Sequence, residues 1–90
     1  MKTTLELLEK AAATMAPLSE RQLSMRLGHA ATTLAMARRR GSLSPVIAGQ
    51  LAELTGDDVV QWMALASLES EPKSAITDRL KRMIANARNS

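Results

Sequence analysis

Three consecutive arginines, Arg38, Arg39 and Arg40, are the clearest candidates for chemistry in this 90-residue chain. A guanidinium presents its N–H donors as a rigid fork that matches phosphate and carboxylate oxygens, so clustered arginines indicate an anion site. Successive positions of a helix are about 100° apart, so these side chains spread over roughly 200°. The alternative is that they stabilise the C-terminal end of a helix by about 0.3–1 kcal/mol each, without a ligand. We favour the anion site because three arginines without an adjacent acidic residue exceed what a helix end requires.

The charges are segregated along the chain, although the net charge is only +3. Residues 21–52 contain five arginines and no acidic residue, whereas residues 53–71 contain five acidic residues and no basic one. The chain becomes basic again after Pro72. This pattern predicts one face that binds a polyanion and another that stays away from it. Chance clustering on a solvated surface is the alternative.

The composition predicts that helices position these charges. Hydrophobic residues make up 46% of the chain, and most of them are leucine, alanine and methionine, which favour helices. The length fits one small all-α domain. Caps and apolar spacing predict five or six short helices. They run from the Thr3–Glu6 capping box to Pro17, from Ser19 to Gly28, from Ala30 to Arg40, from Ser44–Pro45 to Gly56, from Asp57 or Asp58 to Glu71–Pro72, and around Ile76–Ile84.

The second and third predicted helices share a set of packing residues. Leu23 and Leu27 lie on one stripe of the earlier helix, and Ser24 is a small residue that lets the later helix approach closely. Gly28 follows as a residue that readily adopts the left-handed conformation of a turn. Leu34 then takes the position of a core anchor in the later helix.

With these residues, the stretch "LSERQLSMRLGHAATTLAMARRRG", followed by "LSPVIAGQLAELTGDD", resembles the lambda-repressor/Cro-like helix-turn-helix family, in particular small phage-encoded regulators. The resemblance covers about Leu5 to Leu68. It implies an all-α, five-helix DNA-binding domain over residues 1–70 with the motif at 20–40, and an extra C-terminal helix and frayed tail over 71–90. The implied function is a sequence-specific transcriptional regulator of phage or mobile-element type. Its helix 30–40 would lie in the major groove of double-stranded DNA.

The residues expected to contact DNA lie at the start of the first motif helix, in the turn and along the second helix. They are Ser19, Arg21, Gln22, His29, Ala31, Thr32, Thr33, Met36, Arg38, Arg39 and Arg40. A capping box without a ligand is the alternative for Ser19 and Gln22, and a surface or capping role is the alternative for His29. Side chains that form bidentate base contacts are scarce on the second helix, where Ala31 and Thr32 would instead touch thymine methyl groups.

A homodimer is also expected, because apolar residues are in surplus toward the C-terminal end. The candidate dimer contacts are Trp62, Met63, Ile76, Leu80 and Met83.

The alternative function is a small helical adaptor or inhibitor that binds a host protein. Glu20 supports it, because this carboxylate would repel a DNA phosphate unless it caps the helix or pairs with Arg21. The alanine-rich second helix supports it as well, since Met36 beside Ala35 would be an adaptable apolar contact.

Several other classes of function are disfavoured by what the chain lacks. There is no cysteine and only one histidine, so neither thiolate ligands nor a histidine cluster can hold a metal. No Ser–His–acid set and no phosphate-cradling glycine loop is present, so we expect neither an enzyme nor a cofactor. We expect a cytoplasmic protein without membrane association, because no signal peptide and no window of about 18 apolar residues occurs.

Overall fold

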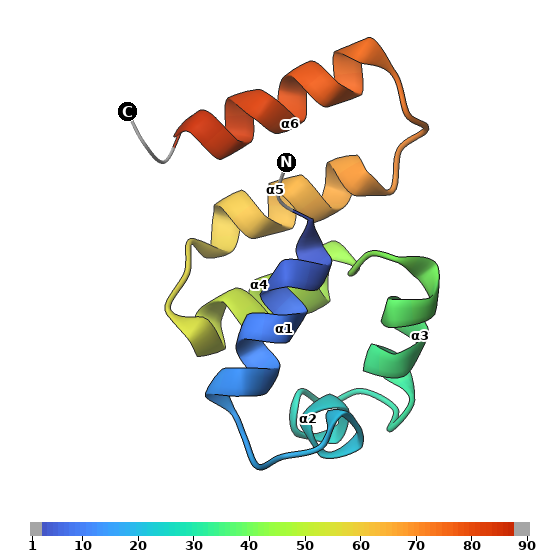
Figure 1. Cartoon of the computed structure of the whole chain (residues 1–90), viewed down its shortest axis with the longest axis vertical. Coiled ribbons are helices and arrows are strands. Elements are labelled where there is room, and N and C mark those ends of the chain that lie inside the picture. The colour runs from blue at the N-terminus through green and yellow to red at the C-terminus, as the bar shows by residue number, and fades with distance from the viewer. Residues whose placement is uncertain (1–2, 88–90) are drawn as a thin grey trace.

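The computed structural model describes residues 3–87, and every regular element within them is a helix (Figure 1). The helices are α1 (Thr4–Thr14), α2 (Glu20–Arg26), α3 (Thr33–Arg40), α4 (Pro45–Thr55), α5 (Val59–Glu69) and α6 (Ala75–Ala87). The predicted all-α class is therefore confirmed. None of the described helices is long and apolar enough to cross a membrane. The predicted fraying of the tail concerns residues 88–90, which lie outside the described residues.

Side-chain caps start three of the helices where the sequence predicts them. The side chains of Ser19, Ser44 and Asp58 each accept a hydrogen bond from the amide three residues further on, at 3.2, 3.4 and 2.8 Å. Each bond satisfies a first-turn amide that has no partner inside its own helix. At the other end of α4, Gly56 has a φ of 76°, a left-handed conformation that ends the helix.

The hydrophobic core is centred on α1, α4 and α5, which pack against one another, and it extends to Leu23 of α2 and to Leu34 and Ala37 of α3. Helices α4 and α5 run in opposite directions, and α1 crosses them (Figure 1). Two adjacent leucines of α1, Leu7 and Leu8, are both buried because α1 contacts α4 on one side and α5 on the other. Trp62 is only 7% exposed and lies in this core with Leu65. Trp62 is therefore not available as the dimer contact that we expected, because α5 turns this face toward α1 and α4.

A polar junction joins the start of α1 to two distant segments. The fully buried Thr4 hydroxyl donates to the carboxylate of Glu69, the last residue of α5, and accepts the amide of Leu43 at 2.9 Å. The Thr4 amide donates to the same carboxylate at 3.0 Å. A negative charge beside a helix N-terminus is favourable because it complements the helix dipole. Glu69 thus fastens α1 to α5.

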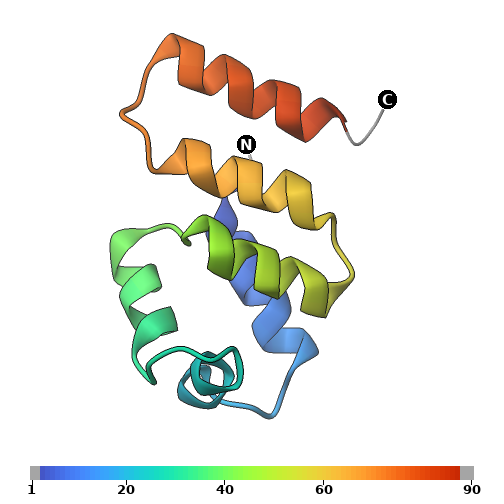
Figure 2. The same cartoon turned by 180° about the vertical axis from the view of Figure 1, so that it is seen from behind.

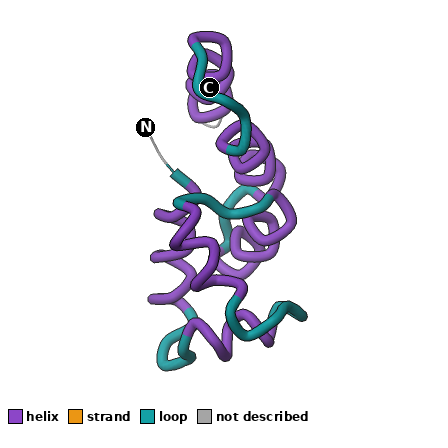
Figure 3. The backbone as a smooth tube through the Cα atoms, turned by 90° about the vertical axis from the view of Figure 1, so that its right-hand side faces the viewer, coloured by secondary structure: helices purple, strands orange, loops and turns teal. Residues whose placement is uncertain are grey.

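Helix α6 forms an outer layer at one end of the molecule (Figures 2 and 3). It packs against α5, and of its described side chains only that of Thr77 is buried. The pair α2 and α3 lies at the opposite end (Figure 1). The core of α1, α4 and α5 therefore separates the two regions that the sequence singled out.

Candidate nucleic-acid interface

Ser19 and Gln22, at the start of α2, are engaged with each other. The Gln22 amide donates to the Ser19 hydroxyl at 3.2 Å, and the Ser19 amide donates to the Gln22 side-chain oxygen at 2.9 Å. This reciprocal pair is a capping box. Both residues are exposed, so the capping box lies at the surface of this end of the molecule.

A buried serine holds α3 against α2. The Ser24 side chain is fully buried in α2, and its hydroxyl oxygen accepts the Leu34 amide of α3 at 3.1 Å. Leu34 is the second residue of α3, so its amide has no partner within its own helix. The side chains of Leu23 and Leu34 are buried beside this contact. One hydrogen bond and one apolar contact region therefore fix the inner face of α3.

The chain leaves α2 through a glycine-dependent turn. Gly28 has a φ of 86°, and its amide donates to the Met25 carbonyl at 3.0 Å. The next amide, that of His29, donates to the Ser24 carbonyl at 3.0 Å. These two bonds form a Schellman motif, which satisfies carbonyls that the end of a helix leaves free. Gly28 is therefore needed for its backbone conformation.

Helix α4 holds this turn through Gln50. The Gln50 side-chain nitrogen donates to the Leu27 carbonyl at 3.0 Å, and its side-chain oxygen lies 2.7 Å from Nε2 of His29. Because the amide oxygen can only accept, the His29 Nε2 carries the hydrogen in this pair. His29, which we expected to contact DNA, is half-buried and bound to α4.

Helix α3 begins later than the sequence predicted. The prediction of a helix from Ala30 is wrong, because the observed helix is Thr33–Arg40. The Thr33 amide donates to the Ala30 carbonyl at 3.0 Å, so residues 30–33 form a turn. In a helix that began at Ala30, the Leu34 amide would donate to the Ala30 carbonyl, but here it donates to the Ser24 hydroxyl and the Thr33 amide takes that carbonyl. Ala31 and Thr32 therefore precede α3.

The outer face of α3 is exposed along its length. Leu34 and Ala37 face inward and are buried. The expected DNA contacts Met36, Arg39 and Arg40 are exposed, as is Thr32 just before the helix, whereas Thr33 and Ala31 are half-buried. Residues three and four apart share one face of a helix, so Thr32, Met36, Arg39 and Arg40 form a single stripe, which we call the outer stripe.

Arg38 points away from the outer stripe and binds two carboxylates. Its Nε lies 2.6 Å from Oε1 of Glu20 on α2, and its Nη1 also pairs with Glu9 on α1. The hydrogen bonds that Arg38 donates to Glu20 and to Glu9 raise the pKa of Arg38 above its ordinary value. Arg38 thus links α3 to α1 and α2, and its positive charge offsets the negative charge of the Glu20 carboxylate.

Four other arginines leave this end of the molecule basic. Arg21 and Arg26 on α2, and Arg39 and Arg40 on α3, are exposed and form no ion pair with any residue in the described part of the chain. Their charges are not cancelled locally, so they favour an approaching polyanion. Within residues 3–87, no three His, Cys, Asp or Glu residues gather as they would to hold a metal ion.

Two contacts of this site join residues that are far apart in the sequence, so neighbouring residues do not predict the pairing. Glu9 lies 29 residues from Arg38, and Gln50 lies 21 residues from His29. Gln50 carries one indirect signal, since it interrupts the apolar run "VIAGQLA" and a polar side chain in such a place needs a partner. Glu9 is one of several charges on an exposed helix face and carries none.

Comparisons of the chain with protein-family models, with curated proteins and with solved structures give no match. The geometry and the charge of the α2–α3 end are therefore the observations on which its function is inferred.

Proposed function

We propose that this protein binds double-stranded DNA through a helix-turn-helix formed by α2 and α3, with α3 lying in the major groove. The proposal rests on the contrast between the inner face of α3, which is packed against the protein, and its outer face, which is exposed. Its inner face is held by the Ser24–Leu34 bond, while its outer stripe ends in Arg39 and Arg40, which form no ion pair among residues 3–86. A rigid helix with a free outer face is what the major groove admits. Helices α1–α5 would then make up a lambda-repressor-like domain, with α6 as an addition.

Within this proposal the residues of the outer stripe have different tasks. Arg39 and Arg40 supply charge to phosphates, which dominate the affinity of most DNA-binding proteins. Thr32 and Met36 are exposed ahead of them and meet the edges of bases. Neither side chain forms bidentate hydrogen bonds, so they discriminate mainly through apolar contact with thymine methyl groups. We therefore propose a sequence preference that is weaker than one read by arginine or asparagine.

The role of a transcriptional regulator of phage or mobile-element type follows from the resemblance of residues 5–68 to the lambda-repressor/Cro-like family. Selection from a pool of random duplexes at low salt tests it. Retained DNA with an enriched sequence is the expected result. Retained DNA without enrichment would leave a non-specific DNA-binding protein, and no retained DNA would overturn the proposal.

The arginines provide a quantitative test. Replacing Arg39 and Arg40 together by alanine should weaken binding to every duplex. It should also lower the slope of log affinity against log salt by about 0.9 for each phosphate that the variant no longer neutralises. Arg79→Ala combined with Arg82→Ala on α6 is the matched control, because it removes two exposed guanidinium groups at the opposite end of the molecule and should leave the slope unchanged. Equal slopes in all variants would contradict the assignment.

An adaptor or inhibitor that binds a host protein is the second candidate. The observation that favours it is the exposure of two methionines at this end, Met25 at 52% and Met36 at 46%. The objection that Glu20 repels phosphate loses force, since Arg38 pairs with it. Salt dependence separates the candidates, because DNA affinity carried by several phosphate contacts falls by orders of magnitude between about 50 and 200 mM salt.

A further inference from the structure

Helix α6 carries a row of large apolar side chains that remain exposed in the folded chain. The row consists of Ile76, Leu80 and Met83, which are 72, 41 and 55% exposed. Residues three, four and seven positions apart share one face of a helix, so the row runs along a single face of α6 for about 10 Å. Single exposed apolar residues are ordinary, whereas a continuous row of them marks an interaction surface.

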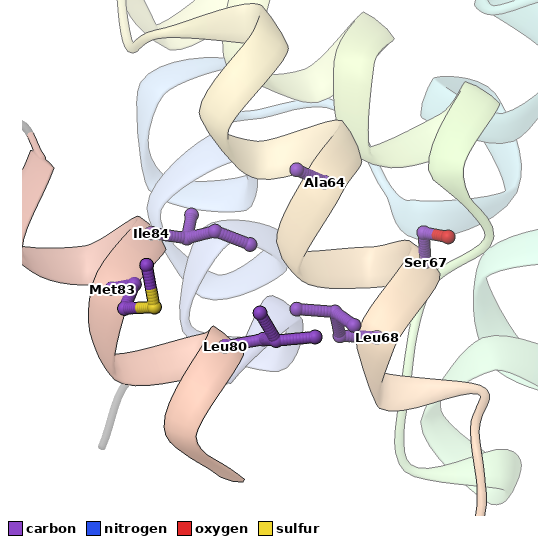
Figure 4. Close-up of a pocket in the computed structure, with 6 residues that line it drawn as sticks. All are labelled: Ala64, Ser67, Leu68, Leu80, Met83 and Ile84. Carbon is purple, nitrogen blue, oxygen red and sulfur yellow. The ribbon is translucent and has the colours of Figure 1, made fainter. Parts of the chain in front are cut away.

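A groove of about 480 Å³ lies beside this row, between α5 and α6 (Figure 4). Its lining residues are Ala64, Ser67 and Leu68 of α5 and Leu80, Met83 and Ile84 of α6. Leu68 and Leu80 point toward each other (Figure 4). On the α5 side, Ala64 and Ser67 are small and leave room for the side chains of a partner. We call the exposed row and the groove together the α5–α6 surface.

The groove is formed within the single chain. Helix α6 packs against α5, and the Gln61 side-chain nitrogen of α5 donates to the Ile84 carbonyl of α6 at 2.6 Å. Ile84 is half-buried by this packing. A preformed site avoids the free-energy cost of ordering it when a partner binds.

Two arginines form the outer edge of the exposed row on α6. Arg79 lies three positions after Ile76 and four before Met83, so it adjoins both on the helix surface. Arg82 lies three positions after Arg79 and continues this edge. Both arginines are exposed and form no ion pair with any residue that the structure describes. The apolar row is therefore bordered by two positive charges.

The acidic residues of α5 and α6 lie away from the groove. Asp78, the one acidic residue of α6, is five positions before Met83, which places it about 140° around the helix. Glu69, the one charged residue of α5, is bound to the start of α1. The connection between the helices carries one exposed residue of each sign, Glu71 and Lys73. The groove thus has a basic edge on α6 and an uncharged edge on α5.

We propose that the α5–α6 surface binds an acidic amphipathic helix of another protein. A row about two turns long fits a helix that anchors itself by apolar side chains at spacings of three, four and seven. These side chains fill the groove beside Ala64 and Ser67. Carboxylates along one edge of the partner helix then face Arg79 and Arg82, and such complementary charges fix its orientation.

A second copy of this chain and a membrane are the other possible occupants. The same surface of a second copy is basic on α6 and uncharged on α5, so it offers no carboxylate to Arg79 and Arg82. A bilayer is flat on this scale and leaves the groove unfilled. The α2–α3 end lies on the other side of the core, so binding of the partner helix does not depend on DNA (Figure 1).

Two synthetic peptides of about 15 residues test the proposal with the full chain. Both have leucine at the three anchor positions, and they carry either glutamate or lysine along the flanking edge. Calorimetry at low salt should show that the glutamate peptide binds about tenfold or more tightly than the lysine peptide. Amide NMR shifts should place the bound glutamate peptide on α5 and α6.

Arginine variants separate this site from the basic α2–α3 end. Arg79→Ala combined with Arg82→Ala should weaken binding of the glutamate peptide by about three- to tenfold, as expected for two exposed ion pairs. Arg39→Ala combined with Arg40→Ala is the matched control, because it removes the same charge from α3. This control should leave the affinity for the peptide unchanged.

A variant of the apolar row tests the groove itself. Met83→Glu should weaken binding of the glutamate peptide by about tenfold or more, because it removes a buried apolar contact and adds a like charge. Val46→Glu on α4 is the matched control, since Val46 is 58% exposed and Met83 is 55% exposed. The arginine variants keep the apolar row, so the test holds even if Met83→Glu disturbs α6, which circular dichroism would reveal.

Four results would overturn the proposal. They are no binding of the glutamate peptide, equal affinity for both peptides, loss of binding in the Arg39/Arg40 variant alone, and equal loss in the Met83 and Val46 variants. A solution mass of twice 9.7 kDa that Met83→Glu halves would overturn it in favour of a second copy. Binding to vesicles of anionic lipid that Met83→Glu abolishes would overturn it in favour of a membrane. None of these outcomes bears on DNA binding.

Discussion

Arg38 shows how contacts between distant residues decide the task of a side chain. In the sequence it is one of three equivalent arginines, and all three are candidates for phosphate. In the structure Arg38 binds Glu9 and Glu20. Arg39 and Arg40 form no ion pair with any residue that the structure describes. Exposed ion pairs contribute little to stability, because water and salt screen them. We therefore infer that Arg38 orients α3 and that its neighbours supply the charge.

Ser24 is the residue whose replacement tests the packing of α3. Ser24→Ala should lower the free energy of unfolding by about 1–3 kcal/mol, because it leaves the buried Leu34 amide without its acceptor. Urea denaturation measures this change. Ser67→Ala is the control, since the Ser67 side chain is exposed, and it should change the free energy by less than about 0.5 kcal/mol. Equal effects of both variants would show that the Ser24 bond does not stabilise the α2–α3 pair.

At the scale of elements, three separate interactions determine the conformation of the connection between α2 and α3. The Schellman motif at Gly28 ends α2, the side chain of Gln50 ties the turn to α4, and the bond from Leu34 to Ser24 sets where α3 begins. The glycine is a strong local signal, and the sequence predicts it correctly. The other two contacts need partners from outside the turn, so the start of α3 differs from the prediction.

The glycine turn predicts the effect of substitutions at one position. Gly28→Ala should destabilise the fold by about 1–2 kcal/mol, because a β-carbon is strained at a φ of 86°. No atom lies within 4 Å of the position that this β-carbon would occupy, so the loss comes from backbone strain and not from a clash. Thermal unfolding measures it. Gly28→Asn should lower the stability less than Gly28→Ala does, since asparagine adopts the left-handed conformation more readily than alanine. If alanine and asparagine behaved alike, backbone strain would not be the cause.

At the scale of the whole molecule, the α2–α3 end and the α5–α6 end lie on opposite sides of one small core (Figure 1). The α2–α3 end carries four exposed arginines that form no ion pair within the described residues, whereas α5 and α6 carry five of the exposed large apolar side chains. Helices α1, α4 and α5 hold them apart through the buried leucines and the Thr4–Glu69 junction. A separation of this kind would let the proposed DNA interface at the α2–α3 end act independently of the α5–α6 end.

Truncation after Glu71 tests the independence of the two ends. The shortened chain should still unfold cooperatively in urea, because Thr77 is the only buried side chain among those described for α6. It should no longer bind the glutamate peptide and should keep its affinity for a short DNA duplex. Circular dichroism, calorimetry with the peptide and binding to the duplex measure the three properties. Loss of cooperative unfolding would show that α6 is part of the core, and unchanged peptide binding would place the peptide site elsewhere.

The sequence by itself determined the helical class and most of the helix ends, because these depend on local physics. Leucine, alanine and methionine favour helices, and caps such as Ser19, Ser44, Asp58 and Gly56 act within a few residues of their own positions. The packing residues Leu23, Ser24 and Leu34 are also correctly predicted as members of one contact region.

Only the tertiary structure decided which polar side chains remain free. Arg38 is engaged by Glu9 and Glu20, His29 is engaged by Gln50, and Trp62 is enclosed by the core, although each had a surface role in the sequence-based prediction. The partners of Arg38 and His29 lie 18 to 29 residues away along the chain. The pairing of such residues depends on how the helices cross, and no property of the local sequence specifies that geometry.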